Sequence, residues 1–414
     1  MAALRSDRLS AAEQRLCSAI KSRERALLDD LRLHVALPTG GRNGAALDET
    51  RERLTARLGA LGAGVALAPG DPAPDWLHGR TPGEAPPPTA LCSRLRSSLP
   101  RVLLAGHLDT VHDPGGSFRE LSIDPGRGTA MGPGCVDMKG GLVIAVAALE
   151  CLDEVGIDCG WTFVLNSDEE TGSYHSDRAL ASEARRHDVG LAVEPALPGG
   201  ELAIERMGSG QFCLRAYGRS AHVGRDFTAG VSAVTALART LVRVAELPRP
   251  EAGIIASVGP LFGGNATNAV PDFAAAWGNV RFADGQGSAR IAAALDALAT
   301  APDAMPRVEV LRSFNRPAKP LLPATQRLAL LARAAAEDLG QTLDFARTGG
   351  VCDGNQLQAA GLPTIDTLGV RGGGLHTPQE WIDLSSLVER CQLLAVLLAR
   401  LAGGAFGHEV RERR

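Results

Sequence analysis

Three short apolar segments, separated by helical patterns, constrain the fold of this chain more than any other feature. They are residues 101–106 (RVLLAG), 161–166 (WTFVLN) and 189–193 (VGLAV). Continuous apolar runs of this length are typical of strands buried on both faces of a parallel sheet. Between them, residues 140–152 and 176–186 carry apolar side chains at helical spacing. This alternation predicts an α/β fold with a mostly parallel central sheet flanked by helices.

The pattern changes after residue 203. Residues 211–218 alternate apolar and polar side chains, as a half-solvated antiparallel strand does. Helical patterns and two further strand candidates follow, and strand–helix alternation resumes after residue 316. We therefore expect one discontinuous α/β domain, residues 1–203 and 316–414, interrupted by an inserted α+β domain at 204–315.

The N-terminal hundred residues are less regular. Periodicity predicts one helix over residues 9–35 and a second over 47–61. Residues 66–100 are rich in Pro, Gly and Ser, and we interpret them as a loop or a poorly structured strand pair.

Charge and hydropathy exclude several classes of protein. The 43 Lys and Arg residues against 47 Asp and Glu give a net charge of −4, so no basic excess is available to bind nucleic acid. No apolar stretch approaches the ~20 residues of a membrane-spanning helix. The first residues lack the continuous apolar core of a secretory leader, and the eight cysteines are scattered, as reduced thiols would be. We expect a cytoplasmic protein that contacts neither membrane nor nucleic acid.

Acidic and imidazole side chains follow all three apolar strands. His107 and Asp109 come after the first, Asp168, Glu169 and Glu170 after the second, and Glu194 after the third. Ligand sites of open parallel sheets gather at the carboxyl ends of their strands. These residues are therefore expected to converge on one small volume.

Several buried acids can lie together only if cations neutralise them, because carboxylates repel strongly at low dielectric. Histidine and carboxylate ligands suit Zn²⁺, and also Co²⁺ or Mn²⁺. This many ligands indicates two ions that share a bridging carboxylate. Taken singly, Asp137 could be only a helix N-cap and His376 only a loop histidine, but the combination and order of the motifs favour a site.

Six motifs between residues 101 and 400 carry a resemblance to a known family: GHLDTV, GPGCVDMKGG, NSDEETGS, VEP, SAHVG and GLHTPQEWID. Together they resemble the dizinc aminoacylase and glutamate carboxypeptidase family (peptidase family M20), whose members include acetylornithine deacetylase and succinyl-diaminopimelate desuccinylase. The chain is most similar to the glutamate carboxypeptidase branch. The resemblance implies a zinc-exopeptidase type of sheet, an inserted dimerisation or lid domain, and two Zn²⁺ per subunit, with Co²⁺ or Mn²⁺ as alternatives.

The resemblance also implies roles for the polar residues. His107 and Glu194 would bind one ion, Glu170 and His376 the other, and Asp137 would bridge them, with a cis peptide after it. Asp109 would accept a hydrogen bond from His107. Glu169 would be the general base, taking a proton from the water that bridges the metals and delivering it to the leaving amine.

The inserted domain and the C-terminal region would supply the substrate contacts. His222 is implied to reach across a homodimer interface and stabilise the oxyanion in the partner's active site. Asn268, Arg281 and Gly350 would lie near the substrate, and Arg316 would bind its free carboxylate through two parallel hydrogen bonds. The substrate would be a small peptide or an N-acyl amino acid.

One departure from the family pattern affects the expected specificity. The segment after Glu194, PALPGGELAIERMGSG, contains no lysine, whereas glutamate carboxypeptidases use one there to hold an acidic side chain. Arg206, Arg347 or an apolar pocket could set a different preference.

The expected activity is hydrolysis of an amide bond next to a free carboxylate, as in a carboxypeptidase, and the alternative is a small-molecule N-acyl-amino-acid deacylase. A metal-binding protein without catalysis is disfavoured because Glu169 and all the ligands are present. A nucleotide-binding dehydrogenase is disfavoured because GPGCVDMKGG lacks the GxGxxG spacing.

Overall fold

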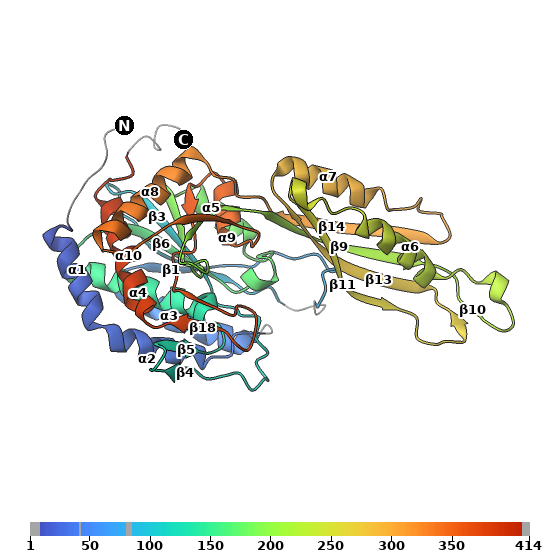
Figure 1. Ribbon diagram of the computed structural model, residues 1–414, viewed down its shortest axis with the longest axis horizontal. Coiled ribbons are helices and arrows are strands. Elements are labelled where there is room, and N and C mark those ends of the chain that lie inside the picture. Colours follow the sequence, from blue (N-terminus) through green and yellow to red (C-terminus); the bar gives the residue numbers. More distant parts are fainter. Residues whose placement is uncertain (1–8, 41–42, 80–84, 408–414) are drawn as a thin grey trace.

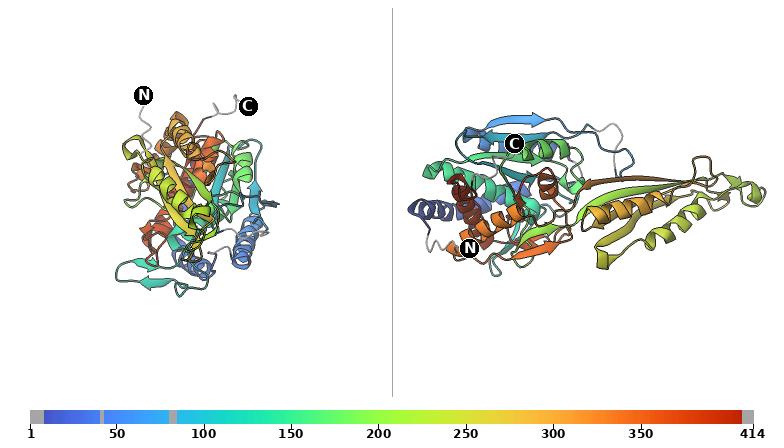
Figure 2. Two further views of the ribbon diagram at one scale, coloured as in Figure 1. Left: turned by 90° about the vertical axis from the view of Figure 1, so that its right-hand side faces the viewer. Right: turned by 90° about the horizontal axis from the view of Figure 1, so that it is seen from above.

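The computed structural model describes residues 9–40, 43–79 and 85–407, which form a larger and a smaller lobe (Figure 1). The larger lobe contains the first and last described residues, Leu9 and Gly407, and a helix-flanked sheet, and the smaller lobe projects from it as an elongated sheet with two helices (Figure 2). Within the described residues, every helix is too short or too polar to span a bilayer.

The larger lobe is built on a six-stranded sheet in the order β1-β2-β6-β3-β7-β16. Strands β6, β3, β7 and β16 run parallel to one another. At one edge, β2 pairs antiparallel with β6, and β1 pairs antiparallel with β2. The predicted α/β fold with a mostly parallel sheet is confirmed. The bounds are β1 (Gly64–Ala68), β2 (Thr89–Arg94), β3 (Arg101–His107), β6 (Gly160–Asn166), β7 (Val189–Ala192) and β16 (Thr364–Ile365).

Helices cover both faces of this sheet, which explains why residues 102–106 of its central strand β3 are all apolar. Val102 and Leu104 of β3 pack in one core with helices α4 and α10, whereas Leu103 and Ala105 pack in a second core with α5 and α9. Alternate side chains of a strand point to opposite faces, so a strand between two helical layers needs no polar position. The helices of this lobe are α1 (Ala11–Ser22), α2 (Glu24–Val35), α3 (Gly44–Ala60), α4 (Gly140–Val155), α5 (Asp177–Ala184), α8 (Pro323–Asp338), α9 (Asp353–Ala359) and α10 (Ser385–Ala402).

Two expectations for the N-terminal region are corrected. The helix expected over residues 9–35 is broken at Arg23, whose backbone leaves the helical region and whose side chain pairs with Glu150 and Glu154 of α4. Of the two alternatives expected for residues 66–100, a loop or a poorly structured strand pair, the strand pair is present as β1 and β2, but it is regular, and β2 also pairs in register with β6. Ala90 and Cys92 of β2 are fully buried, and this packing stabilises a strand that propensity alone does not predict.

The smaller lobe contains a four-stranded antiparallel sheet in the order β11-β13-β9-β14, covered by α6 and α7. Its elements fall within or close to the range predicted for the inserted domain, whose boundaries remain a prediction. They are β9 (Gly208–Tyr217), β10 (Ala221–His222), α6 (Ala233–Ala245), β11 (Ile254–Gly263), β12 (Ala269–Val270), β13 (Phe273–Phe282), α7 (Gly285–Asp296) and β14 (Arg307–Arg316).

Two smaller sheets complete the larger lobe. Strand β8 (Leu202–Arg206) pairs in parallel with β15 (Phe345–Thr348). The other sheet has the order β17-β18-β5-β4 and carries, between β17 and β18, the loop that contains His376. Its strands are β4 (Ser122–Asp124), β5 (Thr129–Met131), β17 (Gly372–Gly373) and β18 (Trp381–Asp383).

Candidate active site

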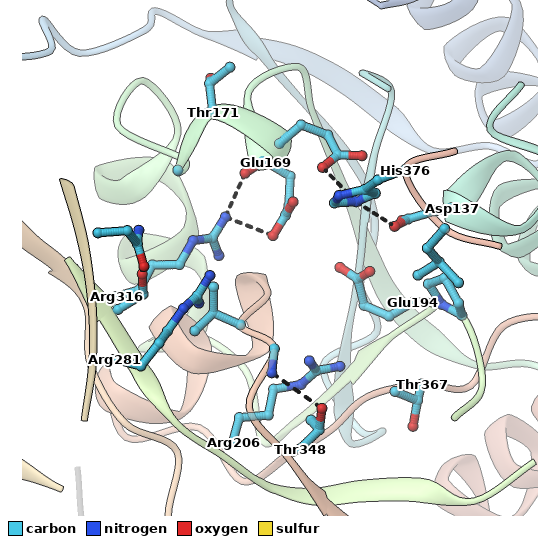
Figure 3. A pocket seen from close by; sticks show the side chains of 18 of the residues that line it. Asp137, Glu169, Thr171, Glu194, Arg206, Arg281, Arg316, Thr348, Thr367 and His376 are labelled. Carbon is cyan, nitrogen blue, oxygen red and sulfur yellow. Dashed lines mark hydrogen bonds and ion pairs between the residues drawn. The ribbon is translucent and has the colours of Figure 1, made fainter. Parts of the chain in front are cut away.

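The carboxyl ends of β3, β6 and β7 place acidic and imidazole side chains together, as expected. His107 is the last residue of β3, Glu169 and Glu170 form a short turn after β6, and Glu194 lies two residues beyond β7. Because β3 lies between β6 and β7, the three ends are adjacent. Asp137 enters from a turn (Cys135–Lys139) that precedes α4, and His376 enters from the loop between β17 and β18 (Figure 3).

Asp137 lies between the two histidines. Its Oδ1 is 3.2 Å from His107 Nε2, and its Oδ2 is 3.5 Å from His376 Nε2. Glu194 Oε2 lies 3.9 Å from His107 Nε2, and Glu170 Oε2 lies 3.4 Å from His376 Nε2. Each carboxylate oxygen of Asp137 therefore faces one histidine–glutamate pair, which is the arrangement expected of a bridging ligand. The peptide bond between Asp137 and Met138 is cis, as predicted.

The electrostatics of this cluster fit bound cations. Burial and the neighbouring Asp137 raise the pKa of Glu170 to about 10, and burial raises that of Glu194 well above its ordinary value. Burial alone would raise the pKa of Asp137, but His107 and His376 outweigh it and lower that pKa. Glu170 Oε1 is buried without a hydrogen-bond partner among the described residues. Two histidines and three carboxylates form a donor set suited to Zn²⁺, so the residues present fit a metal centre.

Asp109 lies beside the second ring nitrogen of His107, as expected. The closer contact of His107 Nδ1 is the Asp109 backbone carbonyl at 2.9 Å, and the carboxylate Oδ1 lies at 3.4 Å. A carbonyl can only accept, so Nδ1 donates, and in the neutral imidazole Nε2 then carries the lone pair that a metal ligand needs. The Asp109 carboxylate instead accepts the backbone N–H groups of Glu169 (3.2 Å) and Glu170 (3.0 Å), and so holds the turn that bears them.

Glu169 is buried beside the guanidinium of Arg316, which the sequence predicts to bind the substrate carboxylate. Arg316 Nη2 donates to Glu169 Oε1 (2.7 Å), to the Glu169 carbonyl (2.8 Å) and to Ser173 Oγ (2.9 Å). Burial raises the pKa of Glu169, and Arg316 opposes that rise. Arg316 is 3% exposed and its Nη1 lies 3.6 Å from Asp353. Its side chain is thus engaged by the chain itself, and its expected contact with substrate stays a prediction.

The other predicted substrate residues differ in their surroundings. Arg281 and Gly350 line a cavity of about 930 Å³ that also reaches Asp137, Glu169 and His376 (Figure 3). Arg281 points into it, and its Nη1 has no hydrogen-bond partner among the described residues. Burial, with the charge of Arg316, lowers the pKa of Arg281.

Arg206 and Arg347, the two arginines considered as substitutes for the lysine of glutamate carboxypeptidases, both form ion pairs with acidic residues of the chain. Arg206 lines the same cavity and donates to Asp366 Oδ1 through Nε (2.9 Å) and Nη2 (2.8 Å). Arg347 is largely exposed, and its Nη2 lies 2.5 Å from Glu205 Oε2. Arg206 is therefore the one that borders the site.

His222 and Asn268 lie far from the cluster within this chain. His222 is on β10, and the Asn268 carbonyl accepts the N–H of Val223 (3.0 Å) beside it. Figure 1 shows β10 at the tip of the smaller lobe, away from the sheet that carries the metal ligands. These residues could serve this type of site only from a second copy, which stays a prediction.

Sequence reasoning missed two buried carboxylates that support the site. Asp353 at the start of α9 accepts Asn166 Nδ2 and Ser173 Oγ, both at 2.6 Å. Glu380 accepts backbone N–H groups from the turn that carries Asp137. Glu380 lies inside the GLHTPQEWID motif, so its position beside His376 was an available signal, whereas nothing local marks Asp353.

Comparisons with known proteins agree with this geometry. The model of the family described as Peptidase family M20/M25/M40 matches residues 103–400. Carboxypeptidase G2 of Pseudomonas sp. (strain RS-16) is 30% identical over 73% of this chain and 74% of its own length. A succinyl-diaminopimelate desuccinylase of Methylobacterium radiotolerans is 31% identical over 72% of this chain and 80% of its own length.

Solved structures share the fold. A tripeptidase from Staphylococcus aureus superposes with a TM-score of 0.72 at 23% identity, covering 91% of this chain and 99% of that one. The dipeptidase Dug1p from Saccharomyces cerevisiae superposes with a TM-score of 0.74 at 15% identity, covering 95% and 99%. From its motifs, its fold and these relatives, the chain belongs to peptidase family M20/M25/M40.

Proposed function

We propose that this protein is a dizinc amide hydrolase that cleaves a peptide or N-acyl bond next to a free carboxylate, in the manner of a carboxypeptidase. The observation that carries the proposal is the position of Asp137, whose two oxygens face two separate histidine–glutamate pairs. His107 and Glu194 would hold one ion and Glu170 and His376 the other. Two ions bound in this way would polarise the scissile carbonyl and lower the pKa of a water molecule.

The chain's own residues supply the proton transfer. Glu169 lies beside the ligand cluster without being assigned to an ion, and Arg316 fixes its carboxylate at 2.7 Å. In this position it takes a proton from the attacking water and delivers it to the leaving amine. Asp109 holds the turn that carries Glu169, so the base is held through its backbone as well as its side chain.

The cavity favours a small substrate with a free carboxylate. Its volume of about 930 Å³ is within the range of small-molecule sites. Arg281 points into it with an N–H group that no described residue accepts, and a guanidinium is suited to bind a carboxylate through two hydrogen bonds. We assign the substrate carboxylate first to Arg281, since Arg316 is occupied by Glu169.

The smaller lobe offers a surface for a homodimer. Strand β11 is an edge strand of its sheet, and exposed apolar side chains lie on β11 and on the neighbouring α6: Leu261 (64% exposed), Phe262 (46%) and Val242 (63%). Pairing of two copies through this lobe would cover these side chains and give His222 and Asn268 a partner site to reach. We propose a homodimer on this basis, and a cytoplasmic location because the described cysteines are all free thiols.

The alternative is a small-molecule deacylase, and the desuccinylase relatives favour it. The test is an assay of the zinc-loaded protein on dipeptides and folate-like aroyl-glutamates against N-acetyl and N-succinyl amino acids, with a chelated sample as control. Faster cleavage of dipeptides and aroyl-glutamates supports the carboxypeptidase proposal, and faster cleavage of N-acetyl or N-succinyl amino acids supports the alternative. Full activity after chelation, without added zinc or cobalt, contradicts both.

A further inference from the structure

Glu380 is the buried end of the loop that carries His376. The loop turns at Gly374, whose carbonyl accepts both the N–H (3.1 Å) and the hydroxyl (2.7 Å) of Thr377. The Glu380 N–H then donates to the Thr377 carbonyl (3.2 Å). His376 is exposed, whereas Glu380 is only 1% exposed. The position of the His376 loop therefore depends on how Glu380 is held.

The Glu380 carboxylate is held by the backbone around Asp137. Its Oε1 accepts the N–H groups of Val136 and of Asp137 itself, both at 2.9 Å. Its Oε2 accepts the N–H of Gly134 at 2.8 Å. Hydrogen bonds to a charged acceptor are roughly twice as strong as neutral ones. The backbone of the proposed bridging residue is thus fixed by a side chain from the His376 loop.

A third segment meets the same carboxylate. His112 Nε2 lies 2.5 Å from Glu380 Oε2 and donates to it, because a carboxylate oxygen is the acceptor. His112 follows His107 by five residues, on the segment that leaves β3. Glu380 therefore joins the segments that carry His107, Asp137 and His376, although it is not itself placed among the ligands.

We propose that Glu380 is a positioning residue that sets where the two oxygens of Asp137 lie relative to His107 and His376. It thereby sets the affinity for one of the two cations that Asp137 would bridge. This inference rests on the proposed dinuclear site. Partners that orient metal ligands typically change metal affinity or activity by about 10–100-fold when replaced. Glutamine at position 380 keeps the size of the side chain, but its NH₂ group cannot accept, so at least one of the three backbone N–H groups loses its acceptor.

The test is a Co²⁺ titration of metal-free Glu380→Gln, wild type and a matched control, followed by visible absorbance and by metal content. The control is Glu183→Gln, the same change at a buried glutamate of α5 that pairs with Arg186. We expect Glu380→Gln to bind one of two cations about 10–100-fold more weakly with an altered cobalt spectrum, and Glu183→Gln to match wild type. Two cations bound by Glu380→Gln with wild-type affinities and spectrum would overturn the inference.

A second variant, Glu380→Asp, and the number of cations bound by wild type complete the experiment. Glu380→Asp keeps the charge and both acceptors but withdraws them by one methylene, so we expect a smaller loss of affinity in the same direction. If Glu380→Gln does not fold, a folded Glu380→Asp protein with wild-type cobalt affinity and spectrum overturns the inference. If wild type itself binds fewer than two cations, the proposed function fails, whereas a wild type that binds two beside an unperturbed Glu380→Gln refutes the role of Glu380 alone.

Discussion

Replacing Arg316 with methionine tests whether this arginine positions Glu169 or binds substrate. The guanidinium is 3% exposed and makes an ion pair with Glu169 at 2.7 Å. Methionine is unbranched and uncharged, so the change removes the ion pair and keeps an apolar stem, although the side chain becomes shorter. Removing one partner of a buried ion pair typically costs about 3–5 kcal/mol. The free energy of unfolding of Arg316→Met should fall by about that amount.

The kinetic effect should be on turnover. Without Arg316, the Glu169 carboxylate keeps no described cation within hydrogen-bonding distance. A misplacement of a reacting group by about 1 Å can cost ~10²-fold in rate. We therefore expect kcat to fall by at least ~10²-fold, while KM changes only a few-fold.

Arg281→Met is the matched control, because it makes the same chemical change on the neighbouring arginine. Arg281 Nη1 has no hydrogen-bond partner among the described residues, and burial and the charge of Arg316 lower its pKa. Its removal should leave the free energy of unfolding unchanged or raise it. If it binds the substrate carboxylate, the loss of charge-assisted hydrogen bonds worth about 1.5–3 kcal/mol raises KM by roughly 10–150-fold.

Denaturant unfolding of the metal-free proteins and steady-state kinetics of the zinc-loaded proteins measure these effects. An Arg316→Met protein of wild-type stability and kcat, with KM raised tenfold or more, would refute the positioning role and restore Arg316 as the substrate clamp.

Three further predictions concern the base, the partner subunit and pH. Glu169→Gln should keep its metal content and lose at least ~10²-fold in turnover; unchanged turnover removes Glu169 from the mechanism. His222→Ala should bind substrate but turn it over slowly, and mixing it with Glu169→Gln should restore part of the activity; no recovery in verified mixed dimers would show that each site is complete within one chain. Burial raises the pKa of Asp168 to about 7 from an ordinary 3.8, so the stability that its protonated form contributes is lost as pH rises from about 4 through 7. Denaturant unfolding of the metal-free proteins measures this as the free energy of unfolding of Asp168→Asn minus that of wild type. The difference should be larger at pH 8 than at pH 5, and an equal difference at the two pH values contradicts the prediction.

The fold class and the family followed from the sequence because both depend on local patterns. The apolar runs at 101–106, 161–166 and 189–193 became β3, β6 and β7, which are buried by helices on both faces. The predicted fold, the resemblance to peptidase family M20 and the class of metal-dependent amide hydrolase are confirmed. The convergence expected at the strand ends is present in the structure, and the catalytic and ligand roles remain predictions. The second cation and the homodimer are proposals.

Other features escaped local reasoning. The break at Arg23 depends on acids of α4 about 130 residues away. The strand β2 lies in a segment of poor propensity and forms because Ala90 and Cys92 complete the core. Both outcomes are tertiary packing overriding a local preference.

The sequence by itself determined which side chains stand at the ends of the buried strands, because strand periodicity and the order of motifs are written in neighbouring residues. Only the tertiary structure decided what those side chains contact. Arg316 meets Glu169 across 147 positions, and Glu380 meets Asp137 across 243. Such pairs depend on how the sheets and loops pack, and a buried charge binds whichever partner that packing brings within hydrogen-bonding distance.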